Sequence, residues 1–488
     1  MRKKLITSFL ALALLLSSIL VICAACQTRD YNHTIYFYSS QGATASVVTQ
    51  QAIESFEAKF PGWKVKHDRP GGYDQVRDKV STELSSDMQP DLAYCYPDHV
   101  AMYLQSRQIL AFDDFINSTE TVPGYKVTKI QDDKGNITTT TEEADFPVGY
   151  ENEEFTTDFY SMYLKDGYAE SFEDYDKYGY TKGTLLALPF VRSTEIMYYN
   201  KTALDELGLD PAETWDELWT QCKQIHSKWP KAMPLAYDSE ANWFIIMCEQ
   251  NGWKYTTNDN VTKPADHYQF NNSDTEKWLQ EIREHYLDKL LITKQAYNGQ
   301  YTSSLFTKGV ANNAAGAVYC IGSSGGASNQ STNNFTVGVA PIPGSNLSDG
   351  SVNYSNISQG PSLCMFRCNK ADNPDEKAKM TFMFVKELLD AEFQAKFVES
   401  SGYMSVRKST EQTQTYLDFI NKTSVKSEVV KLSQKMMEDE LFFVSPSFIG
   451  SSKARTQVGN ALYLAMTGQN TPAKALEIAF RNCAGAIK

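Results

Sequence analysis

The chain has 488 residues, a length that favours two large lobes over one small domain. Its composition, with 42% hydrophobic and 22% charged residues, is that of an ordinary globular protein. The formal net charge of −13 argues against a nucleic-acid partner or a general binder of anionic membranes, because both need a basic face.

The first 26 residues form a targeting segment. Three basic residues at positions 2–4 precede an almost wholly apolar run over residues 5–22. The run ends in Cys23-Ala24-Ala25-Cys26, which resembles a bacterial lipobox except that Cys23 stands where leucine is usual. We therefore expect a signal peptide over residues 1–25, a lipid on Cys26 and a linker over residues 26–31; an uncleaved membrane anchor is the alternative. Either way, the remaining chain is expected outside the cytoplasm, at the extracytoplasmic face of the cell membrane.

Strand and helix patterns alternate from residue 33 onward. Extended patterns cover residues 33–38, 63–67 and 92–96, and helical periods cover residues 47–60 and 76–84. This alternation predicts an α/β sandwich with mainly parallel sheet.

The second part of the chain continues the pattern after a polar insertion. Residues 121–154 are rich in threonine and glutamate, with a turn signal at residues 133–136, and predict a surface β-hairpin. A strand is expected over residues 195–200, and Thr214 opens a capping box for the next helix. An apolar stripe over residues 382–397 predicts one helix that ends at Gly402.

No cofactor or metal centre is expected. The chain after the targeting segment has no H-E-x-x-H and no paired C-x-x-C motif, and its seven cysteines suggest no disulfide framework. Adjacent Tyr198 and Tyr199 could suggest ferric iron, but neighbours on a strand point to opposite faces, so we expect one of them in the core.

A glycine- and serine-rich turn follows the apolar run at residues 317–321. Residues 322–326 (GSSGG) fit the G-x-S-x-G pattern of a nucleophile elbow, with Ser324 as the nucleophile. In an α/β-hydrolase the histidine follows the serine, whereas all six histidines precede Ser324. Other triad orders exist, so a hydrolase stays an alternative. The turn could also hold a ligand by hydrogen bonds, or bind nothing.

Six segments, in chain order, resemble the extracellular solute-binding proteins of ABC transporters, specifically the maltose-binding-like carbohydrate binders. They cover residues 90–94 (PDLAY), 188–201, 319–327, 339–343 (VAPIP), 357–362 and 401–407 (SGYMSVR). The likeness spans nearly all of the chain after the targeting segment. In the last segment Ser405 stands where the family usually has proline.

The resemblance implies an α/β, two-lobed fold of the periplasmic-binding-protein type, with hinge crossovers and a ligand cleft between the lobes. Lobe I would comprise residues 32–189 and 356–405, and lobe II residues 190–355 and 406–488. It further implies a monomer without enzymatic activity, which captures a carbohydrate by hinge closure and delivers it to the transmembrane permease subunits of an ABC transporter. Another solute, such as a peptide or polyamine, is the first alternative, and a serine hydrolase using Ser324 is the second.

A sugar needs flat aromatic rings against its C–H faces and hydrogen-bonding groups around its edge. By the resemblance, the ligand loops offer Ser39, Gln41, Tyr94, Tyr96, Asp98, Arg192, Glu195, Trp243, Ser323, Ser324, Gly325, Gln359 and Tyr403. Asp98 and Glu195 match positions of sugar-binding carboxylates, and Trp243 is the expected stacking platform. Structural roles remain open for several: Tyr94 could face the core, Arg192 could pair with Glu195, and Trp243 could be plain core packing.

Overall fold

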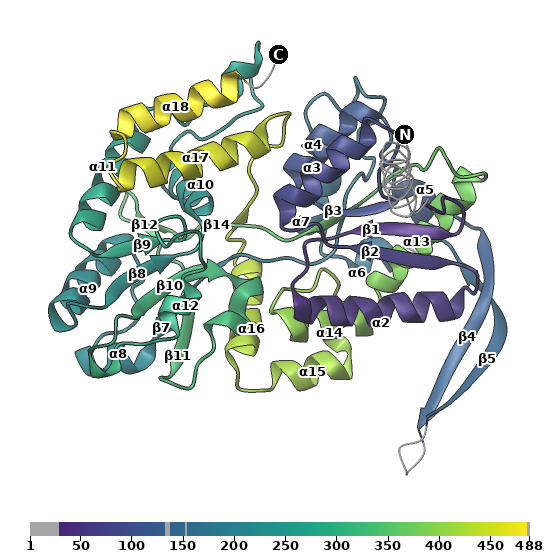
Figure 1. Ribbon diagram of the computed structural model, residues 1–488, viewed down its shortest axis with the longest axis horizontal. Helices are drawn as coiled ribbons and strands as arrows, with labels where there is room; N and C mark the ends of the chain where they lie inside the picture. The colour runs from purple at the N-terminus through teal and green to yellow at the C-terminus, as the bar shows by residue number, and fades with distance from the viewer. Residues whose placement is uncertain (1–28, 132–136, 152–153, 486–488) are drawn as a thin grey trace, which may run out of the picture.

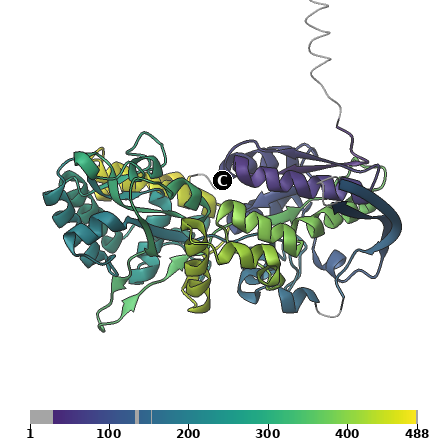
Figure 2. The ribbon, with the colours of Figure 1, turned by 90° about the horizontal axis from the view of Figure 1, so that it is seen from below.

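The computed structural model describes residues 29–131, 137–151 and 154–485 of the chain. Two α/β lobes lie side by side and are joined in the middle (Figures 1 and 2). The predicted signal peptide, Cys26 and the hairpin turn at residues 133–136 lie outside the described residues. Within those ranges, no helix combines the length and apolar character needed to cross a membrane.

Lobe I is built on a five-stranded sheet in the order β2-β1-β3-β15-β6. Its strands are β1 (Thr34–Tyr38), β2 (Lys64–Asp68), β3 (Leu92–Cys95), β6 (Leu188–Pro189) and β15 (Ser362–Met365). Its main helices are α2 (Ala43–Lys59), α3 (Tyr73–Leu84), α13 (Pro374–Leu388) and α14 (Ala391–Ser401).

Lobe II has a second five-stranded sheet in the order β11-β7-β10-β8-β9. Its strands are β7 (Glu195–Asn200), β8 (Met233–Tyr237), β9 (Leu291–Thr293), β10 (Ala317–Ser323) and β11 (Val337–Pro341). Its main helices are α9 (Trp215–Lys228), α10 (Glu240–Asn251), α11 (Ser273–Leu287), α17 (Ser451–Met466) and α18 (Pro472–Ala484).

Both sheets are mixed, so the prediction of mainly parallel pairing is wrong. In lobe I, β1 runs parallel to β2 and β3, whereas β15 runs antiparallel to β3 and β6. In lobe II, β8 runs parallel to β9 and β10, whereas β7 runs antiparallel to β10 and β11. The reason is that β7 and β15 enter their sheets from the other lobe. They start where β10 and β3 end, and therefore run the opposite way.

Two chain segments cross between the lobes side by side, and a third segment, which contains β16, lies next to them. Residues 190–194 link β6 to β7, residues 358–361 link β14 (Asn356–Ile357) to β15, and β16 (Phe442–Phe443) pairs with β14 on the way to α17. The two crossings are bonded directly, since Ser193 and Gln359 exchange backbone hydrogen bonds of 2.8 Å.

The chain between α14 and β16 lies on both sides of the hinge. Past the predicted boundary at residue 405, Val406 still lies in the lobe I core, and α15 (Gln414–Ile420) packs on α14. The next helix, α16 (Val425–Glu438), lies against β11 and the short helix η6 (Ser324–Gln330) of lobe II.

The predicted surface hairpin is confirmed. It consists of β4 (Thr121–Gln131) and β5 (Ile137–Pro147), paired antiparallel along their whole length from Thr121 opposite Pro147. The hairpin projects away from lobe I (Figure 1).

The apolar stripe over residues 382–397 belongs to two helices, so the prediction of one helix is wrong. α13 ends at Leu388, and Asp390 caps α14 by accepting hydrogen bonds of 3.0 Å from the backbone N–H groups of Glu392 and Phe393. The predicted end at Gly402 is confirmed, since this residue adopts the left-handed conformation with φ of 87°. The capping box at Thr214 is also present.

A buried ion pair ties α13 to the lobe I sheet. The Lys377 side chain is 1% exposed, and its Nζ lies 3.5 Å from Oδ2 of Asp91 at the start of β3. The same ammonium donates to the backbone oxygens of Tyr31 (2.8 Å) and Thr34 (2.5 Å). Asp91 also accepts from the backbone N–H of Tyr36 at 2.8 Å, so one pair of charges joins three segments.

Candidate functional site

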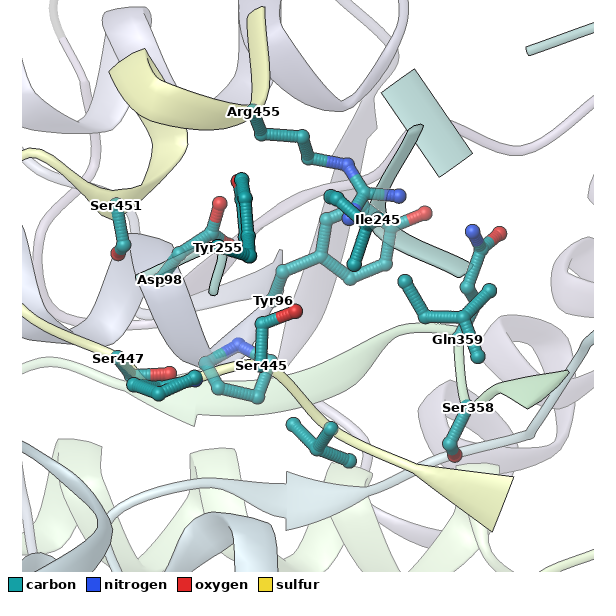
Figure 3. Close-up of a pocket in the computed structure, with 14 residues that line it drawn as sticks. Tyr96, Asp98, Ile245, Tyr255, Ser358, Gln359, Ser445, Ser447, Ser451 and Arg455 are labelled. Atoms are coloured by element: carbon teal, nitrogen blue, oxygen red, sulfur yellow. The ribbon is translucent and has the colours of Figure 1, made fainter. Parts of the chain in front are cut away.

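A pocket lies between the lobes beside the crossing segments (Figure 3). Tyr96 and Asp98 enter it from lobe I, where β3 ends and α4 (Pro97–Tyr103) begins. Tyr255, after α10, and Arg455, on α17, enter it from lobe II. The space free of protein atoms, counted out to its open mouth, is about 540 Å³.

The second crossing and the segment after β16 complete the pocket and leave polar groups free for a ligand. Gln359 and Ser445 both line it, and both are labelled in Figure 3. In the described part of the chain, neither Nε2 of Gln359 nor Oγ of Ser445 has a hydrogen-bond partner, although both atoms are buried. Buried polar atoms are normally paired, so these two are available to a bound molecule or to water.

A series of hydrogen-bonded side chains leads from the pocket into lobe II. Arg455 donates to Oδ1 of Asn242, whose Nδ2 donates to Oε1 of Glu195. Glu195 is 1% exposed, and burial raises the pKa of its carboxyl to about 7. The hydrogen bond from Asn242 and the charge of Arg455 act in the opposite direction. Burial also raises the pKa of nearby Asp238, against hydrogen bonds from Thr302.

Glu195 makes the stability of the protein depend on pH. Its folded-state pKa of about 7 lies above its ordinary value of 4.5. Between pH 4.5 and pH 7, the folded chain therefore keeps a proton on Glu195 that the unfolded chain has lost. The buried carboxylate therefore costs stability above pH 7, and this cost disappears as the pH falls toward 4.5. We expect Glu195→Gln to raise the free energy of unfolding by about 3 kcal/mol at pH 8 and by little at pH 4.5. Urea unfolding at both pH values measures this, and an equal effect at both would contradict it.

Of the predicted ligand residues, three line this pocket: Tyr96, Asp98 and Gln359. The Tyr96 ring is held in place by Tyr73, which stacks on it at 4.3 Å between ring centroids and 25° between planes. The outer position of Asp98 leaves its carboxylate partly exposed.

Three other predicted residues lie inside lobe I. Ser39 is fully buried, with its Oγ 2.7 Å from Nε2 of His67. Tyr94 packs in the core beside Phe190, and its hydroxyl accepts a hydrogen bond from Gln41. These side chains support the end of the sheet below the cleft and are not brought into the pocket.

The glycine- and serine-rich loop is anchored to the first crossing. The hydroxyl of Ser193 lies 2.8 Å from those of Ser323 and Ser324, and Ser324 is fully buried. The other described partner of the Ser324 hydroxyl is the backbone N–H of Thr194 at 3.3 Å. No histidine reaches Ser324 in the described residues, so the nucleophile–base pair that a hydrolase needs is missing there.

The same loop contacts lobe I through a glycine. A Cβ atom at Gly325 would lie 2.7 Å from Cζ of Tyr403, so the tyrosine ring packs directly on the glycine backbone. Tyr403 and Gly325 thus meet at the junction of the lobes, outside the residues that line the pocket.

The structure contradicts the predicted role of Trp243. Its ring is fully buried in the lobe II core, stacked on Tyr237 at 4.7 Å and 12°, with Trp215 stacked at 5.7 Å. A ring covered in this way has no free face for a sugar.

Arg192 also has a different role from those considered for it. It lies within the first crossing and turns to lobe I, where it donates to the backbone oxygen of Tyr163 and to Oγ of Ser362 at 3.2 and 3.3 Å. It therefore neither enters the pocket nor pairs with Glu195.

Sequence reasoning missed Tyr255, Arg455 and the serines between β16 and α17. Tyr255 follows a helix C-cap at Gly252, and Arg455 lies in the interior of α17. Neither stands at a strand end, where the expected ligand loops lie. The sequence signal there was the short Ser445-Pro446-Ser447 turn after the apolar run at residues 441–444.

The described residues show no group of three or more histidine, cysteine or acidic side chains that could hold a metal ion. Tyr198 is fully buried, with its hydroxyl donating to the backbone oxygen of Ser323 at 3.1 Å, which confirms that one of the two adjacent tyrosines is a core residue. All seven cysteines from Cys95 to Cys483 are free thiols.

Two lobes, the crossings that join them and a polar, aromatic pocket between them define a hinged binding protein for a small solute. The bacterial extracellular solute-binding protein family matches residues 51–421, and the chain belongs to this family. The family and the fold are those of binding proteins without enzymatic activity.

Relatives of known sequence and structure agree with this assignment. The sn-glycerol-3-phosphate-binding periplasmic protein UgpB of Rhizobium meliloti (strain 1021) is 29% identical over 240 residues, which are 47% of this chain and 51% of that protein. The match thus spans only about half of the relative's length.

Solved structures confirm the predicted two-lobed fold. The GacH receptor of Streptomyces glaucescens GLA.O, solved unliganded and with acarbose, superposes with a TM-score of 0.67 at 16% identity, covering 94% of this chain and 100% of that one. UgpB from Mycobacterium tuberculosis, in complex with glycerophosphocholine, superposes with a TM-score of 0.66 at 17% identity, covering 93% and 98%.

Proposed function

We propose that this protein captures a carbohydrate in the pocket between its lobes and delivers it to the permease of an ABC transporter. The observation that carries the proposal is the combination of two tyrosine rings, Tyr96 and Tyr255, with the hydrogen-bonding groups of Asp98, Gln359 and Arg455 in one pocket. Flat rings suit the C–H faces of a sugar, the carboxylate accepts from its hydroxyls, and the amide and guanidinium donate to its oxygens.

A ligand that contacts both lobes favours closure of the hinge. Tyr96 and Asp98 belong to lobe I, and Tyr255 and Arg455 to lobe II, so a ligand that contacts both sides binds the closed form more tightly than the open form. One ion pair already joins the two lobes in this structure. Glu173 of lobe I lies 3.0 Å from Nε2 of His267 in lobe II.

The proposal places the protein outside the cytoplasm, anchored to the membrane by a lipid on Cys26. Membership of an extracellular solute-binding family and the Cys23-Ala24-Ala25-Cys26 stretch support this placement. A binding protein of this kind acts as a monomer that presents its closed form to the transmembrane permease subunits.

A glycerol phosphate ester is the second candidate ligand. It is favoured by Arg455 and Ser451, which line the pocket from the first turns of α17, where the positive end of the helix dipole lies. Against it, Asp98 lines the same pocket, and Arg455 is already bonded to Asn242 beside Glu195. A phosphate would have to approach two carboxyl groups, whereas a neutral sugar would not.

Calorimetric titration of the chain with a panel of mono- and oligosaccharides, sn-glycerol 3-phosphate and glycerophosphocholine tests the proposal. We expect a saccharide to bind, and Asp98→Asn and Tyr96→Ala each to weaken it about tenfold or more, since each removes a direct contact of about 1.4 kcal/mol. Asp114→Asn, an exposed carboxylate on lobe I, is the matched control and should leave the affinity unchanged. Binding of the phosphate esters alone would replace the proposal by the second candidate.

A further inference from the structure

A second hollow on lobe II continues the pocket between the lobes. The two share five lining residues: Ile245, Tyr255, Val444, Ser445 and Pro446. They therefore form one groove, and its outer part is the larger, with about 1210 Å³ of space free of protein atoms. Only lobe II, including the segment that contains β16, lines this outer part, so it does not depend on the position of lobe I.

Aromatic rings line the groove from one end to the other. Tyr255 belongs to both parts and Trp253 to the outer part. Backbone hydrogen bonds hold the chain on both sides of Thr256: the N–H of Gln269 donates to the backbone oxygen of Tyr255 at 2.9 Å, and the N–H of Thr257 donates to that of His267 at 3.0 Å. Both aromatic side chains line the groove, and both also pack against the lobe II core.

Hydroxyl groups without partners lie along the same path. Ser445 Oγ is at the junction of the two parts, and Thr256 Oγ1 is in the outer part; both are buried and lack a hydrogen-bond partner among the described residues. With Gln359 Nε2 in the inner part, unsatisfied polar atoms occur in each section of the groove. Leaving such atoms unpaired is unfavourable, and ligand hydroxyls spaced along the groove could pair them.

The charges of the outer part disfavour an anionic ligand. Glu249, Asp259 and Asp266 line it together with one cation, Lys254. A phosphate or carboxylate would meet an excess of negative charge there, whereas neutral sugar hydroxyls can donate to the carboxylates.

We propose that the ligand is an oligosaccharide: its first unit lies between the lobes, and the following units lie on lobe II against Tyr255 and Trp253. This inference rests on the proposed function and adds the length of the ligand. The affinity is accordingly expected to rise from the monosaccharide to the trisaccharide, and Trp253 is expected to contribute only for the longer members.

The experiment compares homologous series from mono- to tetrasaccharide, with glucose units in α-1,4, α-1,6 and β-1,4 linkage, by calorimetry on the wild type and variants. Trp253→Ala should weaken the tri- and tetrasaccharide of the binding series about tenfold and leave the monosaccharide unchanged. Trp229→Ala, also partly buried in lobe II but away from the groove, is the matched control. Thr256→Val removes a hydroxyl that has no described partner, so it should lower the affinity for the longer saccharides without lowering the thermal unfolding midpoint. This second variant keeps the inference testable if Trp253→Ala does not fold.

The outcomes separate this inference from the proposed function. The oligosaccharide proposal is overturned if the affinity does not depend on saccharide length, or if Trp253→Ala weakens all lengths equally. Either result leaves the proposal of a carbohydrate pocket between the lobes intact. The absence of any saccharide binding in the wild type overturns both.

Discussion

Trp243→Ala is expected to destabilise lobe II by about 3–5 kcal/mol, as is usual when a buried tryptophan is truncated. Its ring fills the space between Tyr237, Trp215 and Trp278 in the lobe II core, and the smaller side chain leaves a cavity there. The affinity of the folded molecules for a saccharide should stay unchanged, because Trp243 does not line the groove. Denaturant unfolding gives the stability, and calorimetry below the unfolding transition gives the affinity.

Two further variants test whether the loss of stability comes from the cavity left by the buried ring. Trp243→Phe keeps an aromatic ring and should recover most of the loss, and since Trp243 Nε1 has no described partner, no hydrogen bond is lost with it. Trp229→Ala, at the C-cap of α9 and only partly buried, should cost much less. A Trp243→Ala protein with wild-type stability and no saccharide binding would restore the tryptophan as a stacking platform.

Lys377→Met is expected to have an effect of similar size, about 3–5 kcal/mol at pH 7, in lobe I. The substitution leaves the Asp91 carboxylate buried without its cation, and it removes the donor to two backbone oxygens. Burial already raises the pKa of Asp91 to about 6, so the carboxyl takes up a proton readily once the ammonium is gone. The loss should therefore shrink as the pH falls from 7 to 5, and urea unfolding across this range measures it.

The control for this variant lies on the same helix. Lys379 pairs with Glu120 at the surface, and Lys379→Met should cost no more than about 1 kcal/mol. The double variant Asp91→Asn with Lys377→Met should be more stable than Lys377→Met alone, because no unpaired charge remains buried. A loss in Lys377→Met that is the same at pH 5 and pH 7 would show that the charge of Asp91 is not its cause.

The two lobes and their crossings were expected from the chain length and from the resemblance to solute-binding proteins, whereas many element boundaries have local signals. Periodic apolar residues, the capping box at Thr214 and the glycine at position 402 act within one turn or strand. What the pattern missed was strand direction and the helix break at Asp390. Pairing direction depends on the lobe from which a strand enters, and no local pattern records that.

The site was predictable only in part, for a related reason. Tyr96 and Asp98 follow a strand and Gln359 lies in a crossing, so the resemblance to the family could place them in the ligand loops. Tyr255 and Arg455 reach the pocket only through the packing of α10 against α17, which the sequence does not show. Trp243 was misplaced because a tryptophan in the first turn of a helix looks the same whether it faces the core or the cleft.

The position of β15 in the lobe I sheet has a consequence for the order of folding. This strand lies between β3 and β6, although some 170 residues, including five strands of lobe II, separate β6 from β15 in the chain. A nascent chain that has been synthesised as far as β6 therefore lacks the strand between β3 and β6. The edges of both strands that β15 will later cover are still unpaired. The strands of lobe II, from β7 to β11, follow one another without interruption and can pair as they emerge. We therefore expect the second half of the molecule to complete its sheet first during synthesis, and the amino-terminal half to remain the aggregation-prone species until residue 365 is available.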